Sequence, residues 1–317
     1  MSPAEPRRFS STLGTKPFLI TMEVNPPKGT DLSEILGAVE RARPFVDAIN
    51  VTDGSGAILR ACSLAVAKAV LDAGADPILQ MTCRDRNRLA LQADLLGASI
   101  LGIQNLLLLT GDDPKSGDHP DAKPVFDITS AALMQTARGR NEGRDMAGKL
   151  LTGSPRFCIG AAADPGAKDL EVETQKLKAK IEGGAAFFQT QAVFDAERLR
   201  AFMERARPFG KPVLAGILLV KSAKMARYMN EHVWGIHVPD AIIDRLERAS
   251  DKRAECVAIT IELIRAARGV ADGIHLYALG WEDLVPDILR GAEVITPTGQ
   301  EKSQQEEGNT TSQKAQF

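Results

Sequence analysis

Polar side chains follow most of the apolar, strand-like runs of this chain, at the points where those runs end. Carboxylate, hydroxyl and amide groups of this kind can bind a polar heterocycle and transfer one proton. They do not suit a zinc hydrolase, which needs clustered His or Cys ligands, so we expect no metal. These strand-end residues are Glu23, Thr52, Asp53, Thr82, Cys83, Asp112, Asp164, Gln191, Lys221 and Tyr277.

Glu23 is the most informative of these residues. It lies in the apolar run 17–24, just before Pro26 and Pro27, which cannot continue a β-ladder. A carboxylate is costly to bury among apolar neighbours, and burial tends to raise a carboxyl pKa toward the range of a general acid. Two interpretations stay open from this segment alone, namely a buried acid and a glutamate that faces solvent.

The histidines and cysteines give no ligand spacing. His275 is the only histidine in a predicted strand, and a single strand histidine is more often a structural residue with its hydrogen bonds satisfied. Four widely spaced cysteines without a CxxC pair argue against a structural zinc site or a disulfide framework. They fit a reducing compartment, so we expect a cytoplasmic protein.

Composition excludes several classes of protein. The chain has 317 residues, of which 44% are hydrophobic and 25% charged, as in a globular protein with a large core. The net charge of −2 gives no electrostatic footprint for nucleic acid or an anionic membrane. No apolar run approaches the roughly 18 residues of a membrane span, and the N-terminus lacks the apolar segment of a secretory signal.

Strand-like and helix-like segments alternate along the chain. Alternation predicts a parallel sheet, and eight units at this length favour one closed (β/α)8 TIM barrel over residues 17–292. We expect a loose N-terminal arm over 1–16 and a disordered tail over 293–317, which is polar. The predicted strands are 17–24, 45–52, 77–82, 105–110, 156–162, 186–190, 212–219 and 273–277. In such a barrel the site lies on the loops that follow the strands.

An ordered set of short motifs runs through residues 16–291, and no single one of them is specific. The motifs are Met22–Pro27, Val51–Gly54, Met81–Cys83, Leu109–Asp112, the helical segment up to Lys180, and Gln189–Gln191 with Phe194 and Asp195. As a set they resemble the methylenetetrahydrofolate reductase family of flavin-dependent barrel enzymes. The loop 111–126 and the end 273–281 are similar to the acetogen-type and methyltransferase-fused members.

The resemblance implies a flavin, FAD or alternatively FMN, in the barrel mouth. It implies hydride transfer from NADH or NADPH to 5,10-methylenetetrahydrofolate, in which both substrates use the flavin in turn by a ping-pong scheme. By match to the family, Glu23 is the general acid, Asp112 binds the pterin and tunes the flavin, and Gln191 and Tyr277 contact substrate. The matching flavin contacts are Thr52, Thr82, Gly111, Asp112, Ala162, Asp164 and Lys180.

Several positions depart from the better-known members of the family. Gln80 replaces a histidine, Thr110 replaces an arginine, and Gly160–Ala163 replaces an aromatic-proline pair. Leu219 replaces a proline, and Met225 and Met229 stand where Gln and Phe contact the nicotinamide. These changes leave the flavin and the electron donor open, including reduced ferredoxin delivered by a partner subunit. Two alternatives also stay open, a flavin-free pterin-binding methyltransferase barrel and a non-catalytic subunit. Barrels of this kind commonly associate through their outer helices, so a homo-oligomer is a further expectation.

Overall fold

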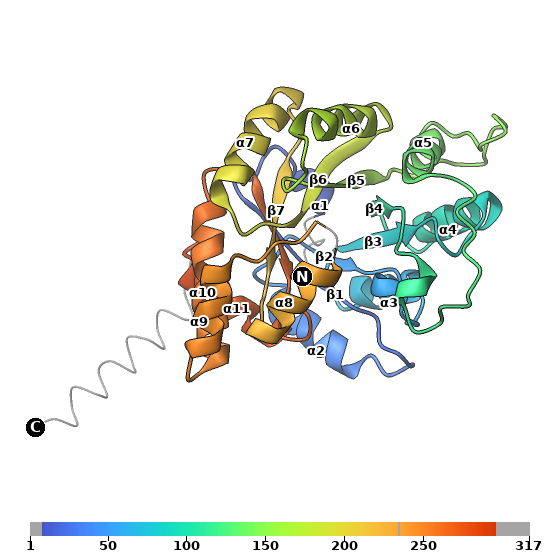
Figure 1. Cartoon of the computed structure of the whole chain (residues 1–317). Coiled ribbons are helices and arrows are strands. Elements are labelled where there is room, and N and C mark those ends of the chain that lie inside the picture. Colours follow the sequence, from blue (N-terminus) through green and yellow to red (C-terminus); the bar gives the residue numbers. More distant parts are fainter. Residues whose placement is uncertain (1–7, 234, 296–317) are drawn as a thin grey trace, which may run out of the picture.

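Eight parallel strands close into a barrel in the order β1 to β8, as predicted (Figure 1). The computed structural model describes residues 8–233 and 235–295. Closure is made by β1 and β8, where Leu19 pairs with Gly273 and Met22 with Leu276. The strands are β1 (Leu19–Val24), β2 (Ala48–Val51), β3 (Pro77–Thr82), β4 (Asn105–Leu109), β5 (Cys158–Ala163), β6 (Ala185–Ala192), β7 (Val213–Leu218) and β8 (Gly273–Tyr277).

Helices surround the barrel (Figure 1). In the described part of the chain, no helix is both long and apolar enough to cross a membrane. The α-helices are α1 (Phe9–Thr12), α2 (Ser33–Ala42), α3 (Ser63–Asp72), α4 (Arg88–Ile100), α5 (Ser130–Asn141), α6 (Leu170–Glu182), α7 (Ala196–Ala206), α8 (Ala223–His232), α9 (Asp240–Arg248), α10 (Lys252–Ala267) and α11 (Val285–Gly291).

The helix starts agree with the sequence in part. Aspartate is a favoured helix N-cap, and Asp195 caps α7, because its carboxylate accepts hydrogen bonds from the Glu197 and Arg198 amides. The spacing of Asp31 and Glu34 predicts a helix with Asp31 as its N-cap, but α2 begins at Ser33 and its cap position is Leu32. The leucine spacing over 86–97 predicts Leu89 on the apolar face of a helix with Leu91 and Leu95, but Leu89 is 74% exposed. Periodicity alone could not set this register, since α4 is rich in leucine around its circumference.

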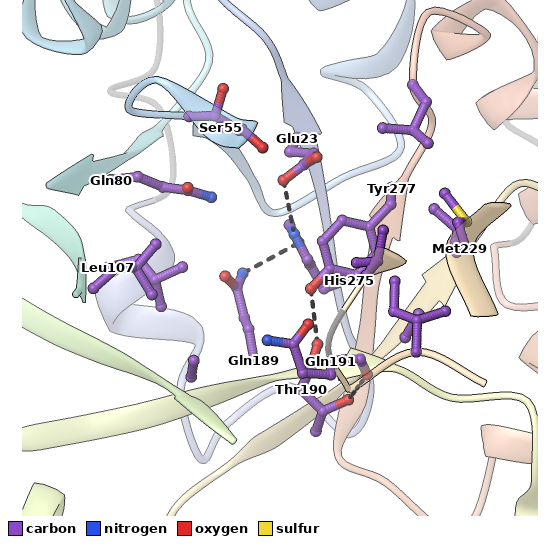
Figure 2. A pocket seen from close by; sticks show the side chains of 18 residues that line it. Glu23, Ser55, Gln80, Leu107, Gln189, Thr190, Gln191, Met229, His275 and Tyr277 are labelled. Carbon is purple, nitrogen blue, oxygen red and sulfur yellow. Dashed lines mark hydrogen bonds and ion pairs between the residues drawn. The ribbon is translucent and has the colours of Figure 1, made fainter. Parts of the chain in front are cut away.

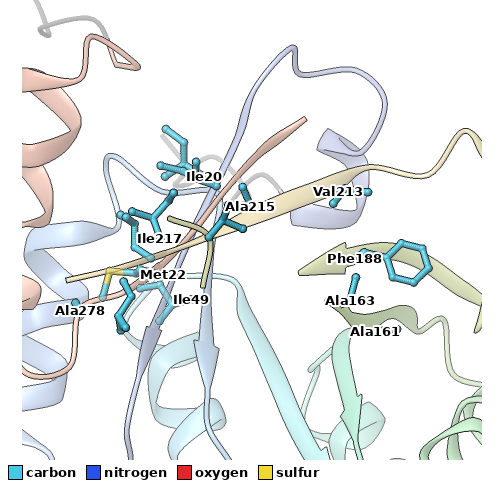
Figure 3. Packing of buried hydrophobic residues seen from close by; sticks show 14 of the residues in the cluster. Ile20, Met22, Ile49, Ala161, Ala163, Phe188, Val213, Ala215, Ile217 and Ala278 are labelled. Carbon is cyan, nitrogen blue, oxygen red and sulfur yellow. The ribbon is translucent and has the colours of Figure 1, made fainter. Parts of the chain in front are cut away.

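The strands are buried on both faces, which explains their continuous apolar runs. Every residue of β1, β3 and β7 is buried. The outward side chains form the main core against the helices, and Figure 3 shows Ile20, Met22 and Ile217 within it. The other alternate positions point into the barrel and are therefore available to build a site.

The N-terminal end of the barrel is closed by Phe9, within the segment expected to be a loose arm. Its side chain is fully buried, and its ring packs edge-on against Phe187 with centroids 5.1 Å apart. The Phe9 amide donates to the Asp76 carboxylate at 2.6 Å. Residues 9–12 form α1, so the arm is ordered from Phe9 onward.

The C-terminal tail was expected from residue 293. Val294 and Ile295 still pack against the main core. From 296 onward the expected tail lies outside the described residues, as do residues 1–7 of the expected arm.

Candidate active site

A cavity of about 300 Å³ opens at the carboxyl ends of the strands (Figure 2). Five of the predicted site residues line it: Glu23, Thr52, Ala162, Gln191 and Tyr277. The cavity is therefore where the barrel topology led us to expect it. The other residues that line it are Ser55, Gln80, Leu107, Leu109, Gln189, Thr190, Ala192, Leu218, Met229, Val233, Ile236, His275 and Leu279.

Glu23 lies at the end of β1 and is 6% exposed, so the interpretation of a solvent-facing glutamate is wrong. Its Oε2 atom is 3.7 Å from Nε2 of His275 (Figure 2). The Tyr277 ring packs edge-on against the His275 ring, with centroids 4.6 Å apart. The Tyr277 hydroxyl donates to the Thr190 carbonyl at 2.8 Å. Burial, and to a smaller degree the nearby Glu23, raise the pKa of Tyr277, which keeps the phenol neutral.

A layer of polar side chains lies inside the barrel around His275. Its Nδ1 atom is 2.9 Å from the Thr21 hydroxyl and 3.3 Å from the Gln189 amide nitrogen. Gln189 and Asn50 exchange two hydrogen bonds, at 2.7 and 3.0 Å. All four residues are buried. Barrel interiors are usually packed with branched apolar residues. Here the hydrogen bonds of a buried polar layer hold these side chains in fixed orientations.

Sequence reasoning treated His275 as structural and used Gln189 only as part of a motif. One signal could have identified His275. Thr21 and Glu23 stand two apart on one apolar strand, and His275 and Tyr277 do so on another. Side chains two apart in a strand share a face, so both pairs point into the barrel.

Thr82 and Asp53 meet outside the cavity. The Asp53 carboxylate accepts hydrogen bonds from the Thr82 amide at 2.8 Å and the Thr82 hydroxyl at 3.0 Å. It also forms an ion pair with Arg86. Thr82 is not among the described residues that line the cavity. Its hydroxyl therefore fastens the end of β3 to the loop after β2.

Asp112 and Gly111 follow β4 and also lie outside the set of described residues that line the cavity. Asp112 is exposed, and its carboxylate accepts a hydrogen bond from the Gly56 amide at 2.8 Å. Gly56 directly follows Ser55, which does line the cavity. Gly111 has a φ of +94°, where a side chain would be strained. The structure thus places Asp112 in a loop that is hydrogen-bonded to Gly56 of the loop after β2, and not in the cavity lining that contains Glu23.

Lys180 and Asp164 lie behind the end of β5. The Lys180 ammonium donates to the Ala162 carbonyl at 2.7 Å, so it reaches the cavity wall. Asp164 is 6% exposed and accepts a hydrogen bond from the Gly166 amide. Burial lowers the pKa of Lys180 and raises that of Asp164, while Glu173 nearby partly opposes the shift of Lys180.

Two other strand-end residues have local roles. Burial raises the pKa of the Cys83 thiol to about 11, which makes it a poor nucleophile. The Lys221 ammonium donates to the Leu279 carbonyl and lies 4.8 Å from the centre of the Trp281 ring. Neither residue is among the described ones that line the cavity.

The residues present fit the ring system of a flavin. Leu107, Leu109 and Ala162 give one side of the cavity an apolar wall, and Lys180 brings a cation to Ala162. Of the small residues of β5, Ala162 is the one that lines the cavity. Of the flavin contacts expected from the sequence, Thr52 and Ala162 line the cavity. Thr82, Gly111, Asp112, Asp164 and Lys180 are not among its described lining residues.

A family model and several curated relatives match this chain. The family model described as methylenetetrahydrofolate reductase matches residues 8–293. "Methylenetetrahydrofolate reductase 1" of Schizosaccharomyces pombe is 25% identical over 288 residues, which are 84% of this chain and 44% of that protein. The "5,10-methylenetetrahydrofolate reductase" of Pectobacterium carotovorum subsp. carotovorum is 26% identical over 280 residues, 84% of this chain and 87% of that protein.

The chain spans less than half the length of several curated relatives that it matches, including those of Schizosaccharomyces pombe and Caenorhabditis elegans. Among solved structures, a protein from Clostridium thermocellum aligns with a TM-score of 0.60 and 16% identity. The alignment covers 87% of this chain and 95% of that one. That protein is described as binding two copies of 5-methyl-5,6,7,8-tetrahydrofolic acid. At this identity the likeness shows the fold alone.

Proposed function

Because this chain belongs to the methylenetetrahydrofolate reductase family, we propose that it reduces 5,10-methylenetetrahydrofolate to 5-methyltetrahydrofolate. The reductant is NADH or NADPH, and the hydride passes through a bound flavin. The single observation that carries the proposal is the buried carboxyl group of Glu23 in the cavity, with His275 beside it. A buried carboxyl that opens onto a ligand-sized cavity is suited to general acid catalysis.

Glu23 delivers a proton to a nitrogen of the imidazolidine ring of the folate. The carbon–nitrogen bond to that nitrogen then breaks, and the ring opens to an iminium that accepts a hydride. The apolar lining, which includes Leu107, Leu109 and Leu218, excludes water from the reacting atoms. Exclusion of water protects the iminium from hydrolysis.

Gln191 and Tyr277 orient the substrate. Gln191 is half-buried in the cavity wall, and its amide can both donate to and accept from a pterin edge. Tyr277 is held in one orientation by its bond to the Thr190 carbonyl. Thr52 follows β2 and also lines the cavity, and its hydroxyl donates to the Asn25 side chain at 2.9 Å.

The flavin would be held by Thr52, Ala162 and Lys180, with Asp112 on the neighbouring loop. When bound, it carries the hydride from the nicotinamide to the folate. Lys180 supplies a positive charge close to the cavity, which suits an anionic part of the cofactor. Met229, Val233 and Ile236 give the opposite side of the cavity an apolar surface.

The visible spectrum of the purified protein tests this proposal. We expect a flavin spectrum that bleaches anaerobically with NADH or NADPH and recovers when methylenetetrahydrofolate is added. Chromatography of the heat-released compound then distinguishes FAD from FMN. A flavin that neither nicotinamide bleaches would contradict the nicotinamide as donor and favour an electron-transfer partner subunit.

One observation favours a second candidate, a pterin-binding barrel that transfers a methyl group without flavin. Of the seven expected flavin contacts, five are not among the described residues that line the cavity. Asp112 is one of these five. One oxygen of its carboxylate accepts from the Gly56 amide, and the other can accept from a pterin N–H group. A colourless protein that cannot be reconstituted with FAD or FMN would overturn the first proposal in favour of this one.

A further inference from the structure

We propose that His275 is a positioning residue that holds Glu23 through a fixed tautomer, with its proton on Nε2, and that it is not a proton relay. The role given to His275 rests on the proposed function, because Glu23 is the acid there. The tautomer itself follows from contacts inside the barrel. His275 is 1% exposed, so its partners are protein groups.

The side of the ring away from Glu23 determines where the proton lies. Nδ1 of His275 meets the Gln189 amide nitrogen at 3.3 Å, and an amide nitrogen only donates. Gln189 is held in this orientation by Asn50, whose amide nitrogen donates to Gln189 Oε1 at 2.7 Å. The two protons of the Gln189 amide go to Asn50 Oδ1 at 3.0 Å and to the Thr21 hydroxyl oxygen at 3.1 Å. The Thr21 hydroxyl proton is then directed at Nδ1 of His275, 2.9 Å away, rather than at the Ile274 carbonyl, 3.4 Å away. Nδ1 therefore accepts, and the ring proton lies on Nε2.

Nε2 faces the acid. It is 3.7 Å from Oε2 of Glu23, which is longer than a hydrogen bond. Catalytic contacts of this kind commonly tighten when substrate binds. An N–H directed at Oε2 leaves Oε1 as the oxygen that carries the acidic proton. His275 thus selects which oxygen of Glu23 delivers the proton.

The network cannot supply protons from solvent. In the described part of the chain, the polar and ring partners of Thr21, Asn50, Gln189 and His275 are one another, Glu23, Tyr277 and the Ile274 carbonyl. Below the network lies the apolar cluster around Phe9 and Phe187. The chain of hydrogen bonds ends at the Asn50–Gln189 amide pair. Glu23 must regain its proton from the cavity side, and His275 acts as a fixed donor.

Two substitutions separate this role from simple packing. In His275→Gln the amide nitrogen reaches the place of Nε2, whereas in His275→Asn it reaches the place of Nδ1. We expect His275→Asn to slow reoxidation of the reduced flavin by methylenetetrahydrofolate by about 10- to 100-fold. His275→Gln should retain the rate to within about threefold, because it restores a donor toward Glu23. Reduction by the nicotinamide should be unchanged in both.

A double variant shows whether His275 acts through Glu23. If it does, adding His275→Asn to Glu23→Gln should give no further loss in the folate half-reaction. The inference would be overturned if the losses of the two single variants multiply in the double variant. Equal losses in His275→Asn and His275→Gln, or slowing of both half-reactions, would also overturn it. Thermal melting of each variant identifies any that have lost the fold.

A measurement that needs no activity tests the tautomer directly. We would record ¹⁵N spectra of histidine-labelled, ligand-free protein and assign His275 by its absence in His275→Gln. We expect a neutral ring protonated on Nε2, with an Nε2 signal that shifts in Glu23→Gln. A ring protonated on Nδ1, or on both nitrogens, would overturn the inference. A wild-type protein that shows the expected tautomer but reduces no folate would refute the proposed function alone.

Discussion

The carboxylate of Asp112 and the backbone amide of Gly56 form a 2.8 Å hydrogen bond that ties the loop after β4 to the loop after β2. The two loops are also in close contact at Gly117. A Cβ atom added there would lie only 1.9 Å from the Ala57 carbonyl oxygen. Asp118 adds a bond to the Leu59 amide and an ion pair with Lys28. These bonds position Asp112 without involving its second oxygen.

Replacing Asp112 by Asn separates its charge from its place in the loop. The Asn side chain can still accept from the Gly56 amide, so the loop contact should survive. We expect folate to bind about tenfold more weakly, equivalent to about 1.4 kcal/mol, because a charged acceptor for pterin N–H groups is lost. The flavin potential should also shift. Titration with folate and redox potentiometry measure both. Asp113→Asn is the matched control, and unchanged values in Asp112→Asn would refute its role.

Glu23→Gln keeps the size of the side chain and removes its acidic proton. We expect folate reduction to fall by at least about 100-fold, since general acid catalysis contributes on that scale. Flavin binding and reduction by the nicotinamide should persist. Stopped-flow absorbance of the two half-reactions measures the difference. Equal loss in both half-reactions would contradict the assignment of Glu23 as the acid.

Gly111→Ala tests the close approach beneath the loop after β4. The φ of +94° disfavours any side chain, and the new Cβ would lie 3.0 Å from the Cβ atoms of Arg84 and Thr82. We expect a loss of about 1–3 kcal/mol in the free energy of unfolding. Gly153 has a φ of +83° but open space around it, so Gly153→Ala controls for backbone strain alone. Urea denaturation gives both values, and equal losses would mean that crowding at Gly111 has no effect.

Phe9→Ala removes the side chain that closes the N-terminal end of the barrel. Phe9 is fully buried, so we expect a loss of about 3–5 kcal/mol in the free energy of unfolding. Leu59→Ala is the control, because Leu59 is 55% exposed and should change stability by less than about 0.5 kcal/mol. Urea denaturation compares them. A small effect in Phe9→Ala would mean that α1 leaves the barrel at little cost.

Asp76 gives the stability a pH dependence. Burial raises the pKa of its carboxyl above the ordinary value of 3.8, although the bond from the Phe9 amide opposes this. The folded protein therefore holds this proton more tightly than the unfolded chain. Its contribution to stability is full below the unfolded pKa of about 3.8 and declines as pH rises through the folded pKa. The unfolding free energy of wild type minus that of Asp76→Asn should fall over this range, and a flat difference would contradict the shift.

The barrel could be predicted because its strands carry a strong local signal. Apolar runs buried on both faces alternate with helices, and the bounds of β3 and β8 match the prediction residue for residue. Other boundaries depend on tertiary contacts. Phe45 and Val46 were expected in a strand, yet they pack against the core before β2 begins at Ala48. The residues that follow the second predicted strand favour a helix over about 58–72, but α3 begins only at Ser63 after a loop.

Local sequence patterns could predict the site residues of each strand, but not the contacts between residues of different strands. The segment around Glu23 left a buried acid and a solvent-facing glutamate both open, and the structure, in which Glu23 is 6% exposed, decides for the buried acid. Its contact with His275 joins the first strand to the last, and no local pattern reports such a pair. Phe9 escaped notice for a similar reason, because a four-residue helix is too short to show periodicity.

The closure of the barrel between β1 and β8 determines when the acid is assembled during synthesis. Glu23 leaves the ribosome among the first residues of the barrel, and His275 and Tyr277 are among the last. Until Gly273–Tyr277 pairs with Leu19–Val24, the carboxylate has neither of these neighbours and stands at an open sheet edge. A chain interrupted before residue 273 would thus carry Glu23 and every cavity residue through Ile236, and still lack an enclosed acid.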